Sequence, residues 1–367
     1  MNSGSIAFIL VCAALVLLMT PALAFFYGGL ERRKNVLNTM LMAVIPLGIA
    51  SILWVAIGYS LSFSGDGSWI GNFNHLFFEG VSMSKNTLHG LEIPDGLFGG
   101  FQMMFSIITV ALITGSVVGR MRFTPLVIFM VFWLILVYYP LAHMVWNPDG
   151  VLFKLGALDF AGGLVVHISS GVSALVACIM LGERVRYKKE AMMPSNIPFV
   201  FIGASLLWFG WFGFNAGSAL GANALAANAF ITTQAAAAMA TVSWVACEWM
   251  HHGKPTILGA ASGCVAGLVA ITPAAGFVAP LPAVFIGLIG GIVCYFAVAV
   301  VKEKFGYDDS LDAFGVHGIG GTWGAVATGL WCSTEINPAG ADGLFYGSAD
   351  TLIAQLISIV VAYVLAI

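Results

Sequence analysis

The sequence predicts an all-α membrane protein with eleven transmembrane helices. Of its 367 residues, 60% are hydrophobic and only 8% are charged, whereas a soluble domain carries about 25% charged residues. A chain with so few charges cannot cover a surface that faces water. Its apolar runs are about 20 residues long and do not alternate between polar and apolar positions, so we expect helices rather than the strands of a membrane barrel.

Eleven apolar runs are long enough to be transmembrane spans. In chain order they cover residues 5–30, 36–62, 97–119, 124–146, 160–181, 197–217, 222–249, 256–274, 280–301, 311–332 and 351–367. No Lys or Arg precedes the first run, so we interpret it as a retained helix rather than a signal peptide. The last run is short for a span, so we expect a final helix that is either truncated or continued into another module.

The loops after the odd-numbered spans carry nearly all of the positive charge. They hold Arg32, Arg33, Lys34, Arg120, Arg122, Arg184, Arg186, Lys188, Lys189, Lys254, Lys302 and Lys304. Of the 14 Lys and Arg residues, only Lys85 and Lys154 fall in the other loops. Because positively charged loops stay in the cytoplasm, we expect a multi-pass protein of the cell membrane with its N-terminus outside and its C-terminus cytoplasmic.

The chain has no linker that would divide it, so we expect one membrane domain over residues 1–367. A charged loop, residues 183–196, separates five spans from the next five, which predicts pseudo-repeats of about 1–182 and 197–332. Five is an odd number, so two similar halves would be inserted in opposite senses. Inverted repeats of this kind form transport pathways near the middle of the membrane.

A short echo in the sequence supports the repeat. His167 lies four residues before Gly171 in "LDFAGGLVVHISSG", and His317 lies four residues before Gly321 in "LDAFGVHGIGG". Leu-Asp precedes both histidines, although the spacing from that Asp to the His is eight residues in the first string and five in the second.

Both histidines are expected at membrane depth. Each lies six or seven residues inside its span, which is roughly 10 Å at 1.5 Å per residue. An ionisable group at this depth normally faces a cavity or a partner. Two interpretations remain open, a buried hydrogen bond between helices and the polar lining of a pore. A metal site needs three or four ligands, and the sequence places no third ligand near His167 and His317, so no metal is expected.

Aromatic side chains gather near the outer ends of three spans. They are Phe101 and Phe105 in "FQMMF", Trp146 in "AHMVWNPDG", and Trp211 and Phe214 in "WFGFNAGS", where Ser218 follows. Aromatic residues at an interface often face lipid. If they converge on a lumen instead, they form a cation–π cage with a hydroxyl acceptor, which suits a small cation. Asp159 begins span five, where it either caps the helix N-terminus or contacts the cation.

These strings resemble the ammonium transporter (Amt/Mep/Rh) family, bacterial and archaeal Amt branch. The resemblance rests on "ALVLLMTPALAFFYGGLERRKNVL", "FQMMF", "PLAHMVW", "GALDFAGGLVVHISSG", "GWFGFNAGSALGAN", "ITPAAGF" and "DDSLDAFGVHGIGG". It implies an eleven-helix ammonium transporter fold with an inverted five-plus-five repeat, a homotrimer with one pore in each subunit, and ammonium or ammonia as substrate, with methylammonium as an analogue. It also implies a possible PII-type regulator or a fused signalling domain.

The resemblance assigns roles by position. Trp146, Phe105 and Ser218 match an outer recruitment site, Phe105 and Phe214 a stacked gate, His167 and His317 a twin-histidine pair, and Asp159 a buried acid near the recruitment site. Further matches, to pore-lining or supporting positions, are Tyr138, Trp211 and Thr272, and Gln102 matches without an assigned role.

We therefore expect a nitrogen-uptake protein that moves NH4+/NH3 through a hydrophobic twin-histidine pore. Moving a bare ion into a low-dielectric interior costs on the order of 20 kcal/mol, so an apolar lumen rejects potassium, whereas ammonium can give up its proton. The alternative is an Amt-type ammonium sensor that signals through a C-terminal domain. No nucleophile accompanies the histidines, so an enzyme is not expected, and neither a cofactor nor nucleic acid is implied.

Overall fold

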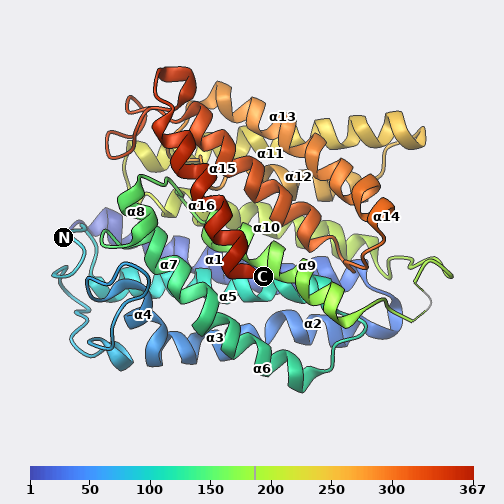
Figure 1. Ribbon diagram of the computed structural model, residues 1–367, viewed down its shortest axis with the longest axis horizontal. Coiled ribbons are helices and arrows are strands. Elements are labelled where there is room, and N and C mark those ends of the chain that lie inside the picture. Colours follow the sequence, from blue (N-terminus) through green and yellow to red (C-terminus); the bar gives the residue numbers. More distant parts are fainter. Residues whose placement is uncertain (186) are drawn as a thin grey trace.

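The computed structural model describes residues 1–185 and 187–367, and in this part of the chain every regular element is a helix (Figure 1). The α-helices are α1 (Ser3–Leu30), α2 (Val36–Val44), α3 (Pro46–Leu53), α4 (Tyr59–Phe63), α5 (Asp95–Val117), α6 (Phe123–Trp133), α7 (Tyr139–Trp146), α8 (Val151–Leu155), α9 (Ser169–Leu181), α10 (Ile197–Gly217), α11 (Ala224–His252), α12 (Ile257–Ile271), α13 (Pro280–Phe296), α14 (Lys302–Phe305), α15 (Ile319–Trp331) and α16 (Asp350–Ala366). The all-α class is confirmed. Arg186, one of the predicted cytoplasmic cations, lies outside the described residues.

The predicted spans are present. Eight helical stretches are long and apolar enough to cross a membrane, and α12 and α16 are shorter apolar helices. With the run Phe314–Trp331, the described part of the chain holds eleven spans. Their ends agree with the predicted ones to within about four residues, the usual uncertainty of such boundaries, except that the fourth stretch continues from residue 146 through α8 to Leu155. The largest differences arise where caps and turns decide the ends, which hydropathy does not report.

Wider and tighter turns interrupt or extend the α-helices. The wider π-helical turns are η2 (Trp54–Gly58), η4 (Leu134–Tyr138), η5 (Gly163–Ile168), η6 (Ala297–Val301) and η7 (Phe314–Gly318), and the tighter 3₁₀ turns are η1 (Arg33–Asn35), η3 (Leu76–Phe78) and η8 (Leu344–Tyr346). Two π-turns, η5 and η7, carry His167 and His317. Such turns occur often at functional sites, and the sequence analysis did not predict them.

Figure 1 shows the long helices side by side, with the N-terminus at one end of the bundle and α16 crossing obliquely over the others. Helix α1 packs along α10, and α11 lies against α12 and α13. Helix α16 contacts both histidine-bearing spans. The Ser173 hydroxyl on α9 donates to the Ala366 carbonyl at 2.7 Å, and Thr322 on α15 lies 2.9 Å from the Tyr363 hydroxyl.

Buried charges join four loops at the face opposite the N-terminus. Asp308 lies 2.7 Å from Nη2 of Arg184 and 2.6 Å from Nη1 of Arg120, and Arg184 also lies 3.4 Å from Glu31. Burial opposes ionisation of Asp308, but the hydrogen bonds and charge of Arg184, together with the charge of Arg120, lower the pKa of this carboxyl below its usual value. The loops after spans one, three, five and nine therefore meet at one end of the bundle.

Candidate functional site

A small chamber opens toward the N-terminal face. Its volume is about 150 Å³, and it is lined by Phe63, Phe98, Gln102, Phe105, Trp146, Phe160, Ser218 and Leu220. A wider depression of about 370 Å³ shares four of these residues and leads outward past His75 and His89. The chamber thus combines aromatic rings with a few polar atoms, although its lining comes from segments far apart in the sequence.

Three polar groups of the chamber have distinct hydrogen-bonding states. The indole N–H of Trp146 donates to the Asp159 carbonyl at 2.8 Å. The Ser218 hydroxyl donates to the Phe214 carbonyl at 2.8 Å, so its oxygen lone pairs remain available as acceptors. The side-chain oxygen of Gln102 is buried without a hydrogen-bond partner in the described part of the chain. Two oxygen acceptors and aromatic faces therefore converge where a small cation would sit.

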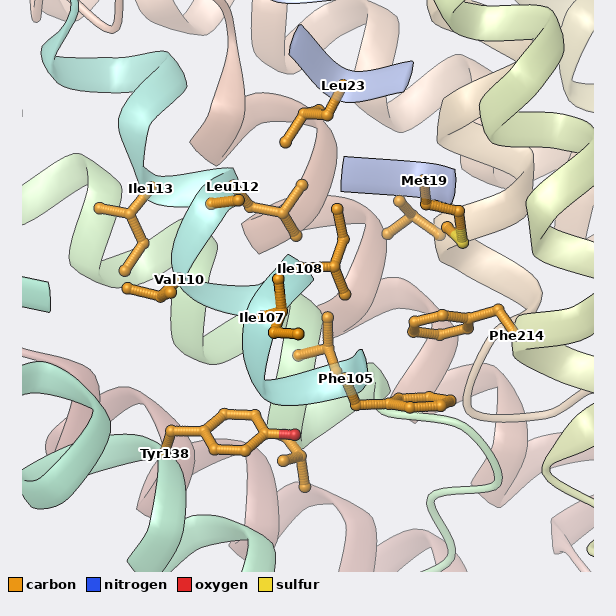
Figure 2. Close-up of a cluster of buried hydrophobic side chains, with 14 of the residues drawn as sticks. Met19, Leu23, Phe105, Ile107, Ile108, Val110, Leu112, Ile113, Tyr138 and Phe214 are labelled. Atoms are coloured by element: carbon orange, nitrogen blue, oxygen red, sulfur yellow. The ribbon is translucent and has the colours of Figure 1, made fainter. Parts of the chain in front are cut away.

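Two phenylalanines close the inner end of the chamber. Figure 2 shows the rings of Phe105 and Phe214 lying one over the other. Their centroids are 4.2 Å apart, and the angle between their planes is 28°. Trp146 meets Phe105 edge-on at 6.1 Å. Phe105 lines the chamber and Phe214 lines the next cavity. The stacked pair is therefore the partition between the two spaces.

Beyond this partition lies a narrow cavity of about 50 Å³, enough for a few water-sized molecules at roughly 10–15 Å³ each. Its lining is largely apolar, with Leu23, Ile108 and Leu112 on one side, and Figure 2 shows these side chains gathered beside the ring pair. The polar lining includes His167, His317 and Asp312. The cavity is thus a narrow, largely apolar space with two imidazoles in its wall.

The two histidines lie against each other inside this cavity. Their Nδ1 atoms are 3.2 Å apart, and the rings are stacked with centroids 5.2 Å apart. His167 also stacks on Trp211 at 5.5 Å. Its Nε2 atom is buried with no hydrogen-bond partner in the described part of the chain. The histidines are therefore joined to each other and keep a free ring nitrogen for a guest.

Two predicted site residues, Phe101 and Tyr138, lie behind the lining. Phe101 is fully buried and meets Phe105 edge-on at 5.0 Å. Tyr138, drawn below Phe105 in Figure 2, is also fully buried, and its hydroxyl has no partner in the described part of the chain. Within the described residues, neither side chain lines the chamber or the cavity.

Thr272 supports Trp211 from behind. Its hydroxyl accepts a hydrogen bond from the Trp211 indole N–H at 2.9 Å and donates to the Leu268 carbonyl at 2.7 Å. The orientation of Trp211, and with it one face of the His167 ring, is therefore fixed by a hydrogen bond between α10 and the end of α12.

Asp159 caps the turn that carries His167. Its carboxylate accepts hydrogen bonds from the backbone N–H groups of Gly162, Gly163, Leu164 and Val165 at 2.5–3.2 Å. It is buried beneath the chamber and is absent from its lining in the described part of the chain. The capping interpretation therefore accounts for its contacts, and it also explains why the helix begins at Gly163.

The counterpart of Asp159 is Asp309, which the sequence analysis missed. Asp309 accepts from the N–H groups of Ala313 and Phe314 at 3.2 and 2.8 Å, and it lies eight residues before His317, the spacing from Asp159 to His167. The pairing of Asp159 with Asp312 in the sequence echo was wrong, because Asp312 instead pairs with Lys302. The sequence carries this signal, because seven residues separate the Asp from the His in both halves.

Two glycines permit the approach of the histidine-bearing helices. A Cβ atom on Gly171 would lie 2.2 Å from the backbone nitrogen of Gly318, next to His317. A Cβ atom on Gly321 would lie 2.9 Å from Cβ of His167. Each glycine stands four residues after one histidine and packs beside the other, so a larger residue at either position would push the pair apart.

The described residues meet the requirements of neither a metal site nor disulfide bonding. Among the described residues, no three His, Cys, Asp or Glu side chains gather as a metal site would require. The six cysteines are free and buried. The side chains of the site can exchange protons at imidazole and contact a cation with aromatic rings and oxygen acceptors.

Known proteins share both the sequence and the fold. The model of the Ammonium Transporter Family matches residues 7–367. The ammonium transporter of Bacillus subtilis is 51% identical over 364 residues, which cover 99% of this chain and 89% of that protein. The crystal structure of Mep2 from Saccharomyces cerevisiae superposes with a TM-score of 0.93 at 35% identity and covers 100% of this chain and 83% of that chain.

A structure named Sensor Amt Protein superposes with a TM-score of 0.90 at 29% identity, over 99% of this chain and 90% of that chain. The family match covers nearly the whole sequence, and the fold agrees along its whole length. The chain therefore belongs to the ammonium transporter family, a family of membrane transporters and channels and not of enzymes.

Proposed function

We propose that this protein conducts ammonium across the cell membrane by passing neutral ammonia through the histidine-lined cavity. The observation that carries the proposal is the contact between the Nδ1 atoms of His167 and His317 inside an apolar passage behind two stacked rings. Family membership and the similarity to ammonium transporters support the same substrate.

Recruitment takes place in the outer chamber. The ring faces of Trp146 and Phe105 attract a cation, which is a contact of about 1–2 kcal/mol when partly desolvated. The oxygens of Ser218 and Gln102 accept N–H bonds from NH4+. Ammonium has four N–H donors in a tetrahedral arrangement and potassium has none, so the acceptors add a preference that size and charge cannot supply.

NH4+ gives up one proton in the outer chamber before ammonia enters the apolar cavity. The proton follows through the His167–His317 pair and rebinds ammonia at the inner face, so that one positive charge crosses with each ammonia molecule. An unpaired charge in the cavity carries the large desolvation cost of a low-dielectric medium, while ammonia carries no charge. The free Nε2 of His167 can donate to, or accept from, a passing ammonia molecule. The histidine pair therefore lowers the desolvation cost of an ammonia molecule by hydrogen bonding to it. Two imidazoles cannot replace the hydration shell of a potassium ion.

A current measurement tests the proposal. Purified protein in proteoliposomes on a solid-supported membrane should give a transient current after an ammonium pulse and none after a potassium pulse of equal concentration. Methylammonium should give a smaller current. Ammonium binding without any current or ammonia flux would contradict conduction.

That last outcome is the prediction of the alternative function, an ammonium sensor. The fold likeness to Sensor Amt Protein favours it. The higher identity to ammonium transporters supports conduction instead.

The remaining features of the proposal concern orientation and assembly. We place the N-terminus and the outer chamber outside the cell, because the cationic loops lie at the other face. By the family resemblance, the functional unit is a homotrimer with one pore per subunit, and a PII-type regulator or a fused signalling domain is the candidate cytoplasmic partner. The pseudo-repeats 1–182 and 197–332 are proposed as an inverted pair, supported by the shared Asp-to-His spacing and the reciprocal glycine contacts.

A further inference from the structure

Gln355 on α16 makes three hydrogen bonds to two other segments, although it lies outside the chamber and the cavity. Its side chain is fully buried. Its Oε1 accepts from the backbone N–H of Leu158 at 2.9 Å, and its Nε2 donates to the Leu158 carbonyl at 2.9 Å and to the Ala325 carbonyl at 3.0 Å. One amide therefore holds both polar groups of Leu158 and a carbonyl on a different span.

The two segments that it joins lead to the two histidines. Leu158 directly precedes Asp159, whose carboxylate caps the turn with His167 and whose carbonyl accepts the Trp146 indole N–H. Ala325 lies on α15, two helical turns beyond His317. Gln355 thus connects Trp146 of the outer chamber, the His167 turn and the His317 helix.

The other bonds of α16 are less specific for this connection. Tyr363 touches only the α15 side through Thr322, and Ser173 reaches the backbone of Ala366 on the α9 side. Gln355 alone, among the described side chains of α16, bonds to both the Leu158 peptide and α15. An apolar residue there would leave the N–H of Leu158 and a carbonyl oxygen buried without partners, a costly state inside a membrane.

We propose that Gln355 is a positioning residue, which sets the outer recruitment site and the histidine pair in one register through the Leu158–Asp159 peptide. This inference rests on the proposed function. It adds that the eleventh span, which contributes no side chain to the described lining of the chamber or cavity, controls the geometry of both.

The first test compares Gln355→Leu with Ser358→Ala. Ser358 is equally buried one turn further along α16, but its hydroxyl donates only to the Ala354 carbonyl of its own helix. In Gln355→Leu, the apparent KM for ammonium should rise roughly three- to ten-fold, because Trp146 loses a fixed acceptor, and ammonium-over-potassium selectivity should fall. Ser358→Ala should keep both values.

The second test uses Gln355→Glu and its pH profile. A protonated glutamic acid accepts from the Leu158 N–H and donates to one carbonyl, so it restores two of the three bonds. The carboxylate form instead faces two carbonyl oxygens and is repelled by them. KM should therefore approach the wild-type value as pH falls and depart from it as pH rises, relative to wild type at each pH. A side chain that merely fills space would give no such difference.

A third measurement does not depend on transport. Hydrogen–deuterium exchange should be faster over residues 158–165 in Gln355→Leu than in wild type, and unchanged in Ser358→Ala. Wild-type KM, selectivity and exchange in Gln355→Leu would overturn the inference, as would a flat relative pH profile in Gln355→Glu if the leucine variant does not fold. Absence of ammonium current in wild-type protein would contradict the proposed function, while the exchange comparison would still decide the role of Gln355.

Discussion

The Nδ1 atoms of His167 and His317 lie 3.2 Å apart, so the tautomer of one ring fixes that of the other. A neutral imidazole has one N–H and one lone pair, and a bond between two Nδ1 atoms needs one of each. One ring must then carry its proton on Nε2, and the other must present an Nε2 lone pair. The pair therefore offers the lumen one donor and one acceptor, which matches the needs of an ammonia molecule.

This coupling predicts that the two histidines act as a unit. His167→Leu, His317→Leu and the double variant should each lower the ammonium-evoked current by a similar factor, on the order of ten-fold or more, because each breaks the same proton-sharing pair. His251→Leu is the matched control, since His251 lies at the end of α11 beside Tyr295. Multiplicative losses in the double variant, or unchanged current and selectivity in His317→Leu, would exclude a shared proton.

Trp146→Leu should weaken recruitment without removing conduction. Loss of a cation–π contact worth about 1–2 kcal/mol corresponds to a rise in apparent KM of roughly five- to thirty-fold, with a maximal current close to wild type. Trp208→Leu serves as the control, because Trp208 bonds to the exposed Gln234 side chain away from the chamber. An unaltered KM in Trp146→Leu would count against the cation–π site.

Gln102→Leu should change stability and affinity in opposite directions. The Gln102 oxygen is buried without a partner in the described structure, so its removal should raise the unfolding temperature slightly. If the same oxygen accepts a bond from ammonium, apparent KM should rise roughly three- to ten-fold. Thermal unfolding and current titrations on one preparation measure both effects. A stability gain at unchanged KM would show that the oxygen does not serve recruitment.

Asp309 should make stability depend on pH. Burial first, and the Asp312 carboxylate second, raise the pKa of Asp309 to about 6, whereas an unfolded Asp has a pKa of about 3.9. The folded chain thus binds this proton more tightly, so its stabilising contribution is complete below about pH 4 and is lost as pH rises through about 6.

The asparagine variant isolates that contribution. Asp309→Asn cannot ionise, so between pH 4.5 and 7.5 its free energy of unfolding should fall less than that of wild type, by about 1–3 kcal/mol, and its unfolding temperature should fall less accordingly. Asp350→Asn, at the exposed first residue of α16, should follow wild type. Parallel curves for wild type and Asp309→Asn would contradict the shifted ionisation.

Much of the fold could be predicted because the bilayer imposes it. Apolar runs of span length and one-sided Lys and Arg locate the helices and their alternation. His167 and His317 could be singled out because ionisable groups in such runs are rare. The π-turns that carry these histidines could not be predicted, because no particular amino-acid composition distinguishes a π-turn from the α-helix around it.

The errors and omissions have physical causes. Asp312 was matched to Asp159 because both follow a leucine, but the role of a cap depends on distance to the helix start, which Asp309 satisfies. Phe63 and Phe160 join the chamber from separate segments, which no local pattern reveals. The contacts of Gln355 depend on where α16 crosses the bundle, a property of packing rather than of sequence period.

The small volume of the inner cavity has a consequence for traffic. A passage of about 50 Å³ seats only a few molecules in a row, and none can overtake another. In the proposed function, water and ammonia must therefore leave in the order in which they arrive, so the two fluxes are coupled. An osmotic gradient across such a pore would speed or slow the movement of ammonia, according to the direction of water flow. Tracer exchange would be slower than net movement down a gradient.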